Sequence, residues 1–123
     1  MKTNPVDALT YRTAMAEIAE SVHVVTTDGA VGRRGVTATA FTSVSDKPAT
    51  VLVCLNRHNP ANDLFEQNGV FAVSTLAAEH QPLAEAFSGL GGLAADARFA
   101  LGQWERVETG APVLIGAMAA FDC

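Results

Sequence analysis

The chain has 123 residues and a mass of 12.8 kDa, a size typical of one domain. Surface scaling predicts that folding buries about two thirds of its accessible surface. Hydrophobic residues make up 49% and charged residues 17%, against about 25% charged residues in an average soluble domain, so an intrinsically disordered chain is excluded. Eight Lys and Arg against 13 Asp and Glu give a formal net charge of −5, which argues against a nucleic acid as the main partner.

The cysteines and the hydropathy indicate the cellular compartment of the protein. Two cysteines, Cys54 and Cys123, do not make a disulfide framework and favour a reducing compartment. No apolar run reaches the roughly 20 residues of a membrane-spanning helix, and no signal peptide opens the chain. We therefore expect one cytoplasmic domain over residues 1–123, with no membrane association.

The N-terminal region predicts a helix. Asn4 is suited to cap it, and Pro5 is suited to its first position. Apolar side chains then recur at helical spacing from Tyr11 through Met15 and Ile18 to Val22. We expect this face to pack in the core or against a second subunit.

Two strand patterns follow. Residues 22–27 are a β-branched run that predicts a strand, and Asp28-Gly29 predicts a turn. Residues 29–35 read as a flexible loop with two adjacent arginines. Residues 36–45 then alternate, with mostly hydroxyl-bearing side chains at odd positions and mostly apolar ones at even positions. This period of two predicts one continuous strand, which Lys47-Pro48 ends.

The rest of the chain predicts more strands than helices. In chain order we expect a strand at 50–56 buried on both sides, a helix at 59–69 closed by Gly69, a strand at 70–76, a helix at 79–88 with Leu83, Ala86 and Phe87 inward, an irregular or extended piece at 99–107 and a last strand at 113–121. Alternating strand–helix units are lacking. The order therefore favours a mainly β fold with flanking helices, a small barrel or sandwich, over a doubly wound sheet.

Familiar catalytic spacings are missing from the sequence. It has no G-x-S-x-G, no H-E-x-x-H and no C-x-x-C. His23, His58 and His80 lack the spacing of a ligand pair, so we expect no metal. Neither glycine cluster has the spacing of a dinucleotide-binding G-x-G-x-x-G or of a P-loop.

The hydroxyl-bearing strand is one candidate binding segment. Ala38 and Ala40 leave space in which a flat ring could approach the backbone, while Thr37, Thr39 and Ser43 offer hydroxyl groups along one face. The pattern equally fits an ordinary threonine-rich strand that faces solvent.

The segment from Leu52 to Pro60 is the second candidate. An apolar strand here leads into a helix start, where free backbone N–H groups favour an anion. Asn56 and Asn59 could donate to a phosphate, and Arg57 or the pair Arg33-Arg34 could neutralise it. Alternatively, Asn59 only caps the helix.

An ordered set of short segments resembles the short-chain flavin reductases, the reductase components of two-component flavin monooxygenases such as those acting on 4-hydroxyphenylacetate. The segments are Val-Val-Thr-Thr-Asp-Gly at 24–29, Gly-Val-Thr-Ala-Thr-Ala-Phe-Thr-Ser-Val-Ser at 35–45, Leu-Val-Cys-Leu-Asn-Arg at 52–57, Asn-Gly-Val-Phe-Ala-Val-Ser at 68–74, Phe-Ser-Gly at 87–89, Arg-Phe at 98–99, Trp104, Thr-Gly-Ala-Pro-Val-Leu at 109–114 and Phe-Asp-Cys at 121–123. The resemblance spans about residues 9–123. It implies an FMN-binding split β-barrel and a homodimer. It also implies reduction of free FMN or FAD by NADH or NADPH, with delivery of the reduced flavin to a partner monooxygenase.

By position, the resemblance implies a set of cofactor-binding residues. They are Thr37, Ala38, Thr39 and Ala40 along the flavin, Cys54, Leu55 and Asn56 against its ring or ribityl chain, Asn59 at its phosphate, and Phe87 and Arg98 where the pocket closes. The family usually has Ser or Thr at the position of Asn59. No catalytic acid or base is implied, because the protein has only to position the two reactants.

The family continues past the position of Cys123 with further strands, including a Gly-Asp-His or Gly-Thr-His segment near the nicotinamide. We therefore expect a split barrel without its C-terminal strands, either a fragment or a fold that a partner subunit completes. Two other functions stay open: a flavin-binding module without turnover, and a structural or assembly protein.

Overall fold

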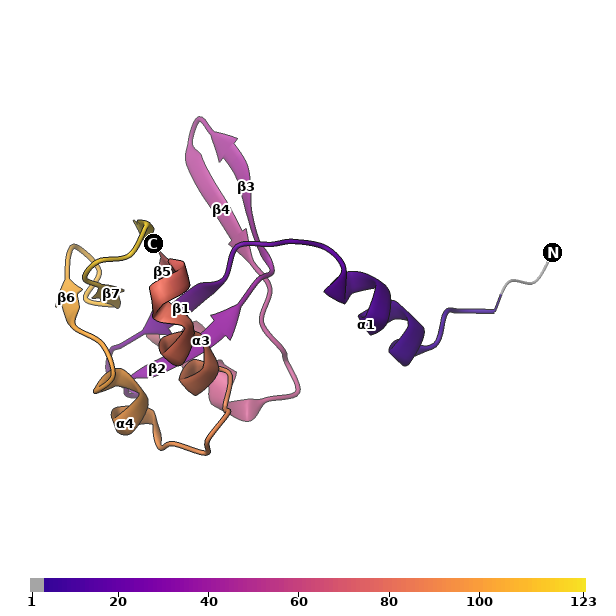
Figure 1. The fold of residues 1–123 in the computed structure, drawn as a ribbon. Coiled ribbons are helices and arrows are strands. Elements are labelled where there is room, and N and C mark those ends of the chain that lie inside the picture. The colour runs from indigo at the N-terminus through magenta and orange to yellow at the C-terminus, as the bar shows by residue number, and fades with distance from the viewer. Residues whose placement is uncertain (1–3) are drawn as a thin grey trace.

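The computed structural model describes residues 4–123. Its centre is a four-stranded antiparallel sheet in the order β2-β1-β5-β8 (Figure 1). These strands are β1 (His23–Thr27), β2 (Arg34–Ala38), β5 (Ala72–Thr75) and β8 (Ala119–Asp122). Two further antiparallel pairs, β3 (Phe41–Asp46) with β4 (Ala49–Val53) and β6 (Trp104–Arg106) with β7 (Pro112–Leu114), complete the described strands.

The helices are short. They are α1 (Ala8–Ala16), the 3-10 turn η1 (Pro60–Asn62) leading into α2 (Asp63–Asn68), the turn η2 (Ala78–His80) leading into α3 (Gln81–Phe87), and α4 (Ala95–Phe99). The mainly β fold with flanking helices is confirmed, and no closed barrel is formed by residues 4–123.

The core lies between the central sheet, α3, α4 and β7. One cluster joins Val24 of β1 to Leu83 and Phe87 of α3, Phe99 of α4 and Leu114 of β7. The predicted inward residues Leu83, Ala86 and Phe87 are all buried. β1 also contacts α2, and every residue of this strand is buried. The predicted strand at 22–27 is thereby confirmed, as is the helical stretch that ends at Gly69, which has φ 72°.

The predicted bounds of the N-terminal helix are wrong. It begins at Ala8, because the Asp7 carboxylate accepts a hydrogen bond from the Thr10 backbone N–H at 2.9 Å and from the Thr10 hydroxyl at 2.6 Å. It ends at Ala16, so Ile18 and Val22 lie beyond it. None of its residues is buried, and α1 stands apart from the sheet in Figure 1.

Two predicted strands are in fact each two strands. The stretch 36–45 breaks at Thr39-Ala40, after which the chain leaves the central sheet and begins the β3–β4 hairpin. The stretch 113–121 likewise breaks between β7 and β8, where Gly116 has φ 90°. In both cases the apolar pattern continues through the break while the pairing partner changes.

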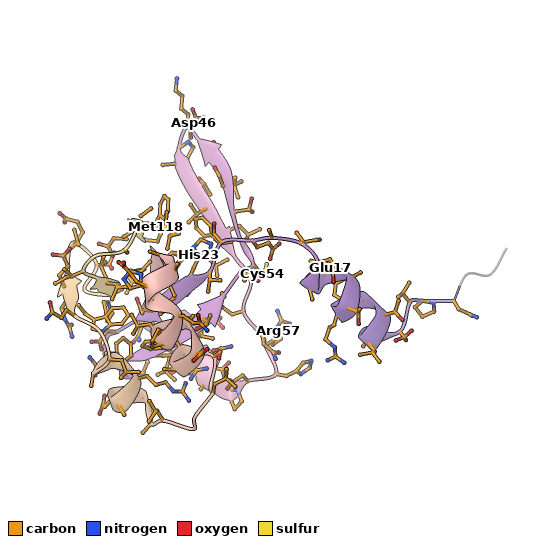
Figure 2. The ribbon with its side chains drawn as sticks, in the orientation of Figure 1. Glu17, His23, Asp46, Cys54, Arg57 and Met118 are labelled. Atoms are coloured by element: carbon orange, nitrogen blue, oxygen red, sulfur yellow. The ribbon has the colours of Figure 1, made fainter. Side chains whose placement is uncertain are left out.

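The β3–β4 hairpin projects from the body, and this corrects the prediction for residues 50–56. Within β4 no residue is buried, and Leu52 is 51% exposed. An apolar run predicts burial on both sides only if other elements cover both sides. Here the hairpin is a two-stranded arm, with Asp46 at its tip and Cys54 at its base (Figure 2). The predicted irregular or extended piece at 99–107 contains β6, but the prediction missed α4, which ends at Phe99.

Candidate functional site

The free edge of β2 is the first component of the candidate site. β2 pairs with β1 on one side and is the outermost strand of the central sheet on the other. An outermost strand presents alternate backbone N–H and C=O groups that no neighbouring strand uses. Beyond it, Thr39 and Ala40 are exposed and offer small side chains, while their carbonyls accept from the Phe41 and Cys54 N–H groups.

The segment 54–62 flanks this edge and touches it at both ends. At one end the Cys54 N–H donates to the Ala40 carbonyl at 3.0 Å. At the other end Arg34 donates from Nε and Nη2 to Asn62 Oδ1 at 3.1 and 3.0 Å. Between these contacts, no backbone hydrogen bond joins the two stretches in the described chain. We call this arrangement, residues 34–40 with residues 54–62, the β2-edge site.

Asparagine side chains shape the 54–62 segment. Asn56 Oδ1 accepts from the His58 N–H at 2.9 Å, and Asn59 Oδ1 accepts from the Ala61 N–H at 3.1 Å. Asn59 therefore caps η1, as one interpretation of the sequence held, and its amide NH₂ remains a possible donor. Asn62, which the sequence did not single out, joins the segment to β2 because its Oδ1 accepts from Arg34. Its Nδ2 donates to the Asn56 carbonyl at 2.8 Å within the segment.

The two predicted threonine donors have different surroundings. Thr37 is half-buried, and its hydroxyl donates to the Ala84 carbonyl of α3 at 2.7 Å. Thr39 is exposed and lines a cavity of about 390 Å³ together with His23, Phe41 and Phe121. The odd-numbered side of β2 is therefore covered by α3, and only beyond the strand does a hydroxyl become accessible.

Phe87 lies beneath the site, not in it. Its side chain is 2% exposed and packs edge-on against Phe99 and Trp104, with ring centroids 5.0 and 5.7 Å away. A Cβ on Gly35 would lie 2.5 Å from Phe87 Cε1, so glycine is what allows β2 to lie on this ring. Phe87 can thus act on the β2-edge site only through the position of β2.

The remaining predicted residues surround the site unevenly. Cys54, Asn56 and Asn59 are exposed and Leu55 is half-buried, all on the flanking segment. Arg57, labelled in Figure 2, follows them and is exposed. Arg98 belongs to α4, is half-buried, and donates from Nε to the Leu93 carbonyl at 2.8 Å.

A second aromatic group lies where β1, β3 and β8 meet. The His23 ring is 4.6 Å from the Phe41 ring, which is 5.4 Å from the Phe121 ring. His23 is 4% exposed, its Nδ1 lies 3.1 Å from Thr75 Oγ1, and its burial lowers its pKa. A larger cavity of about 780 Å³ opens between the hairpin and β8, lined mostly by apolar groups that include Val51, Phe71 and Phe121. Of the candidate binding residues from the sequence, Ser43 lines this larger cavity, whereas the cofactor-binding residues that the resemblance implies do not.

Residues 4–123 hold no cluster of three or more His, Cys, Asp or Glu side chains placed to bind a metal ion. Nor does any helix in that range combine the length and the apolar character needed to cross a bilayer.

Comparison with known proteins identifies the family. Residues 15–123 match the flavin reductase like domain. The FMN reductase (NADH) RutF 2 of Methylorubrum extorquens is 54% identical over 118 residues, which are 96% of this chain and 67% of that protein. The corresponding RutF of Agrobacterium fabrum is 51% identical over 99% of this chain and 69% of its own length. The chain thus spans about two thirds of these relatives.

Solved structures agree with this match. A candidate flavin reductase from Haemophilus somnus superposes with a TM-score of 0.90 at 41% identity, covering 96% of this chain and 74% of that one. The NADH:FAD oxidoreductase SgcE6 of Streptomyces globisporus, in complex with NAD and FAD fragments, gives a TM-score of 0.84 at 31% identity over 100% and 72% of the two chains. The styrene monooxygenase flavin reductase of Pseudomonas putida S12 gives 0.76 at 30% identity over 93% and 71%. A strand edge flanked by polar groups, a match over residues 15–123 and these likenesses together establish that the chain belongs to the flavin reductase family.

Proposed function

We propose that this chain binds FMN at the β2-edge site and catalyses its reduction by NADH. The observation that carries the proposal is the free edge of β2, held beside the polar 54–62 segment by contacts at Ala40 and Arg34. Relatives named FMN reductase (NADH) and a neighbour solved with NAD and FAD fragments support the choice of ligands.

The residues of the site fit a flavin. Its ring carries carbonyl oxygens and ring nitrogens that pair with backbone N–H and C=O groups, which the β2 edge supplies. Ala38 and Ala40 add no bulk that would hold a ring away from the backbone. The Thr39 hydroxyl and the amide groups of Asn56 and Asn59 are exposed nearby and offer further donors.

The main task of the protein in this reaction is to position the two reactants. Bound flavin supplies the acceptor for the hydride that the reduced nicotinamide donates, and the accompanying proton comes from solvent. The β2 edge fixes one reactant, and open access on the side of Cys54 and Asn56 leaves room for the second. The sequence, which has no familiar acid–base or nucleophile motif, agrees with this division of labour.

A second copy of the chain and a monooxygenase complete the proposed function. The exposed apolar residues of α1, with Leu9 at 70% and Tyr11 at 59%, support a homodimer, because a helix this short gains its stability from packing. The P. putida neighbour, a reductase of styrene monooxygenase, supports delivery of reduced flavin to a monooxygenase. We further propose one domain over residues 1–123 and a cytoplasmic location, in keeping with the absence of a membrane-spanning helix in residues 4–123.

The test is NADH oxidation, followed at 340 nm with and without FMN or FAD, on protein shown to be folded by circular dichroism. We expect NADH loss to depend on added flavin and to be faster with FMN. Quenching of flavin fluorescence without NADH oxidation would instead indicate a flavin-binding module without turnover. No effect of flavin on either signal would refute both.

A further inference from the structure

His23 is the one buried histidine of this chain, and it lies where the hairpin arm leaves the central sheet. Its side chain is 4% exposed, whereas His58 is exposed and His80 is half-buried. His23 opens β1, opposite Ala38 of β2 on one side and Thr75 of β5 on the other. The ring also lines a cavity of about 390 Å³, through which a proton from solvent can reach it.

The hairpin base, residues 39–41 with Cys54, joins this point to the β3–β4 arm. The Phe41 N–H donates to the Thr39 carbonyl at 2.8 Å, and the Cys54 N–H donates to the Ala40 carbonyl at 3.0 Å. Beyond the base, β3 and β4 pack mainly on each other. The hairpin base therefore sets the direction of the arm, and it also contains Thr39 and Ala40, which form one end of the β2-edge site.

An aromatic contact connects His23 to the hairpin base. The Phe41 ring lies 4.6 Å from the His23 ring, with 46° between the ring planes, and 5.4 Å from the Phe121 ring of β8. His23 lies at the foot of the arm (Figure 2). Its Nδ1 lies 3.1 Å from Thr75 Oγ1, which orients the imidazole. Phe41 is thus held between a ring of β1 and a ring of β8.

A proton on His23 would meet no buried counter-ion in the described chain. Burial lowers the pKa of His23, and no neighbouring charge raises it. Glu20 is the one charged residue that lines the cavity beside the ring, and it is exposed, so water screens its charge. The charged groups of the adjoining strands lie elsewhere: Asp46 at the hairpin tip, Asp122 hydrogen-bonded to the loop between β6 and β7, and Arg34 at the far end of β2.

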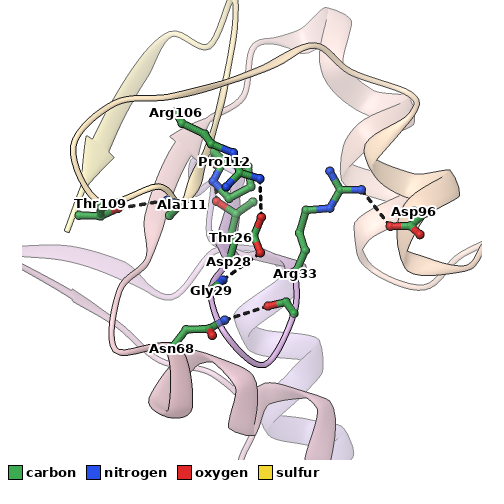
Figure 3. Close-up of polar contacts among 11 residues, drawn as sticks. Thr26, Asp28, Gly29, Arg33, Asn68, Asp96, Arg106, Thr109, Ala111 and Pro112 are labelled. Carbon is green, nitrogen blue, oxygen red and sulfur yellow. Dashed lines mark hydrogen bonds and ion pairs between the residues drawn. The ribbon is translucent and has the colours of Figure 1, made fainter.

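The ion pairs beside the central sheet lie at the opposite end of β1 (Figure 3). Arg33 pairs with Asp96 at 2.9 Å, and Arg106 pairs with Asp28 at 2.6 Å. Asp28 follows the last residue of β1 and is about 16 Å from His23 at the rise of a strand. At that distance, and with their own arginines beside them, these carboxylates do not stabilise a cation at His23.

We propose that His23 is a positioning residue for the β2-edge site: its neutral ring supports Phe41 and so fixes the hairpin base, and protonation of the ring releases the base and weakens flavin binding. The inference deepens the proposed function and rests on it for the choice of ligand. A neutral imidazole packs against Phe41 as another flat ring does, whereas a buried imidazolium without a counter-ion is costly unless the ring moves out to water. Moving the ring removes the contact that holds Phe41, which directly follows Thr39 and Ala40 in the chain.

The direction of the pH effect follows from the coupling between proton and flavin binding. The closed hairpin base disfavours the proton on His23, and flavin binds the closed base, so flavin and proton compete. The dissociation constant should rise as the pH falls below the pKa of His23 in the free protein, which burial places under 6.5. One proton limits the rise to about tenfold per pH unit.

The test measures riboflavin affinity by fluorescence quenching between about pH 7.5 and about pH 5.5, the range in which histidine titrates. Riboflavin is the probe because it lacks the phosphate of FMN, which itself takes up a proton near about pH 6. Circular dichroism at each pH checks that the chain is folded.

Three variants are compared with wild type. His23→Phe keeps an aromatic ring beside Phe41 and removes the titrating group. Phe41→Leu keeps His23 and removes the ring through which it supports the base. The control His80→Gln removes the other histidine that is partly buried and keeps a side-chain acceptor for the Ala77 N–H, because glutamine is favoured at that position of a helix start.

Wild type and His80→Gln should bind riboflavin about 3- to 10-fold more weakly at the lower pH than at the higher pH. His23→Phe should bind within about threefold of wild type at the higher pH and change less than about twofold with pH. Phe41→Leu should bind more weakly at the higher pH and also lose the pH dependence. A wild-type affinity that does not depend on pH, or either of these two variants with the wild-type dependence, would overturn the proposal.

Backbone amide and histidine ring signals of the isotopically labelled chain without flavin keep this test independent of the proposed function. The amide signals of the hairpin base should shift with the same midpoint as the His23 ring in wild type and stay constant in His23→Phe. That result in a chain that binds no flavin at any pH would refute the proposed function and keep the link between His23 and the hairpin base. Flavin reduction by a chain whose hairpin base does not follow the His23 ring would refute the inference and keep the proposed function.

Discussion

Gly35→Ala tests how tightly β2 lies on the aromatic core beneath the candidate site. The added Cβ would lie 2.5 Å from Phe87 Cε1, 2.8 Å from Phe87 Cδ1 and 3.2 Å from Phe99 Cζ. Phe87 cannot turn away, because it is 2% exposed and packs edge-on against Phe99 and Trp104. Gly35 does not have a positive φ, so steric contact alone decides the outcome.

The magnitude follows from two opposing effects. Overpacking a core by one methyl group costs about 1–3 kcal/mol, and the rigid ring places this case in the upper half of that range. Replacing glycine within a strand returns about 0.5–1 kcal/mol. We therefore expect Gly35→Ala to lower the free energy of unfolding by about 2 kcal/mol, measured by urea denaturation at equal m-value.

Phe87→Leu supplies the matched background, because it makes room at the position of contact. In that background Gly35→Ala should cost less than about 0.5 kcal/mol, which gives a coupling of at least 1 kcal/mol between the two sites. A stability of Gly35→Ala equal to or above wild type would show that β2 does not lie where the structure puts it.

Three further predictions concern single side chains. Thr39→Val should weaken FMN binding by about 1–3 kcal/mol in fluorescence titrations through loss of an exposed hydroxyl; unchanged affinity would show that Thr39 is no flavin donor. Asp122→Asn should lower the free energy of unfolding by about 1 kcal/mol at neutral pH, because the carboxylate accepts from the Thr109 hydroxyl and from the N–H groups of Thr109 and Glu108 at 3.0 and 2.7 Å. Burial raises the pKa of Asp122, but those hydrogen bonds outweigh it and hold the pKa below 3.8. The stabilisation by this carboxylate should therefore be present above about pH 3.8 and fade as the pH falls through the folded-state pKa. Equal acid sensitivity of Asp122→Asn and wild type would contradict this. Burial lowers the pKa of His23 below 6.5, so as the pH falls the unfolded chain takes up the proton first. The free energy of unfolding should then decrease below about pH 6.5 until the folded-state pKa is reached, by at most about 1.4 kcal/mol per pH unit. Urea midpoints should depend less on pH in His23→Asn, and an identical dependence would show that His23 is not the group responsible.

The sequence predicted correctly those elements whose structure depends on nearby residues more than on contacts with distant ones. The strand 22–27, the helix end at Gly69 and the inward face of Leu83, Ala86 and Phe87 are set by residue type and spacing over a few positions. Each of the two predicted strands that break has halves that pair with different strands: β2 pairs with β1 and β3 with β4, while β7 pairs with β6 and β8 with β5. A period of two shows which side a residue faces, and it does not show that β2 pairs with β1 while β3 pairs with β4.

The sequence predicted segments of the candidate site but not the contacts that join them. The Cys54 N–H donates to the Ala40 carbonyl, so the two segments meet at that point, and the role of their residues in flavin binding stays a prediction. The contact of Arg34 with Asn62 spans 28 positions, and the burial of Phe87 under Gly35 depends on α3 folding over β2. No pattern of spacing encodes such contacts, because they arise only when separate elements pack.

The most direct test of the central claim is the map of backbone amide signals of the isotopically labelled chain during titration with FMN. The account predicts that shifts concentrate at residues 34–40 and 54–62, the two sides of the β2-edge site. Shifts confined to the larger cavity between the hairpin and β8, at residues such as Val51 and Phe71, would contradict it. So would a folded chain whose spectrum FMN leaves unchanged.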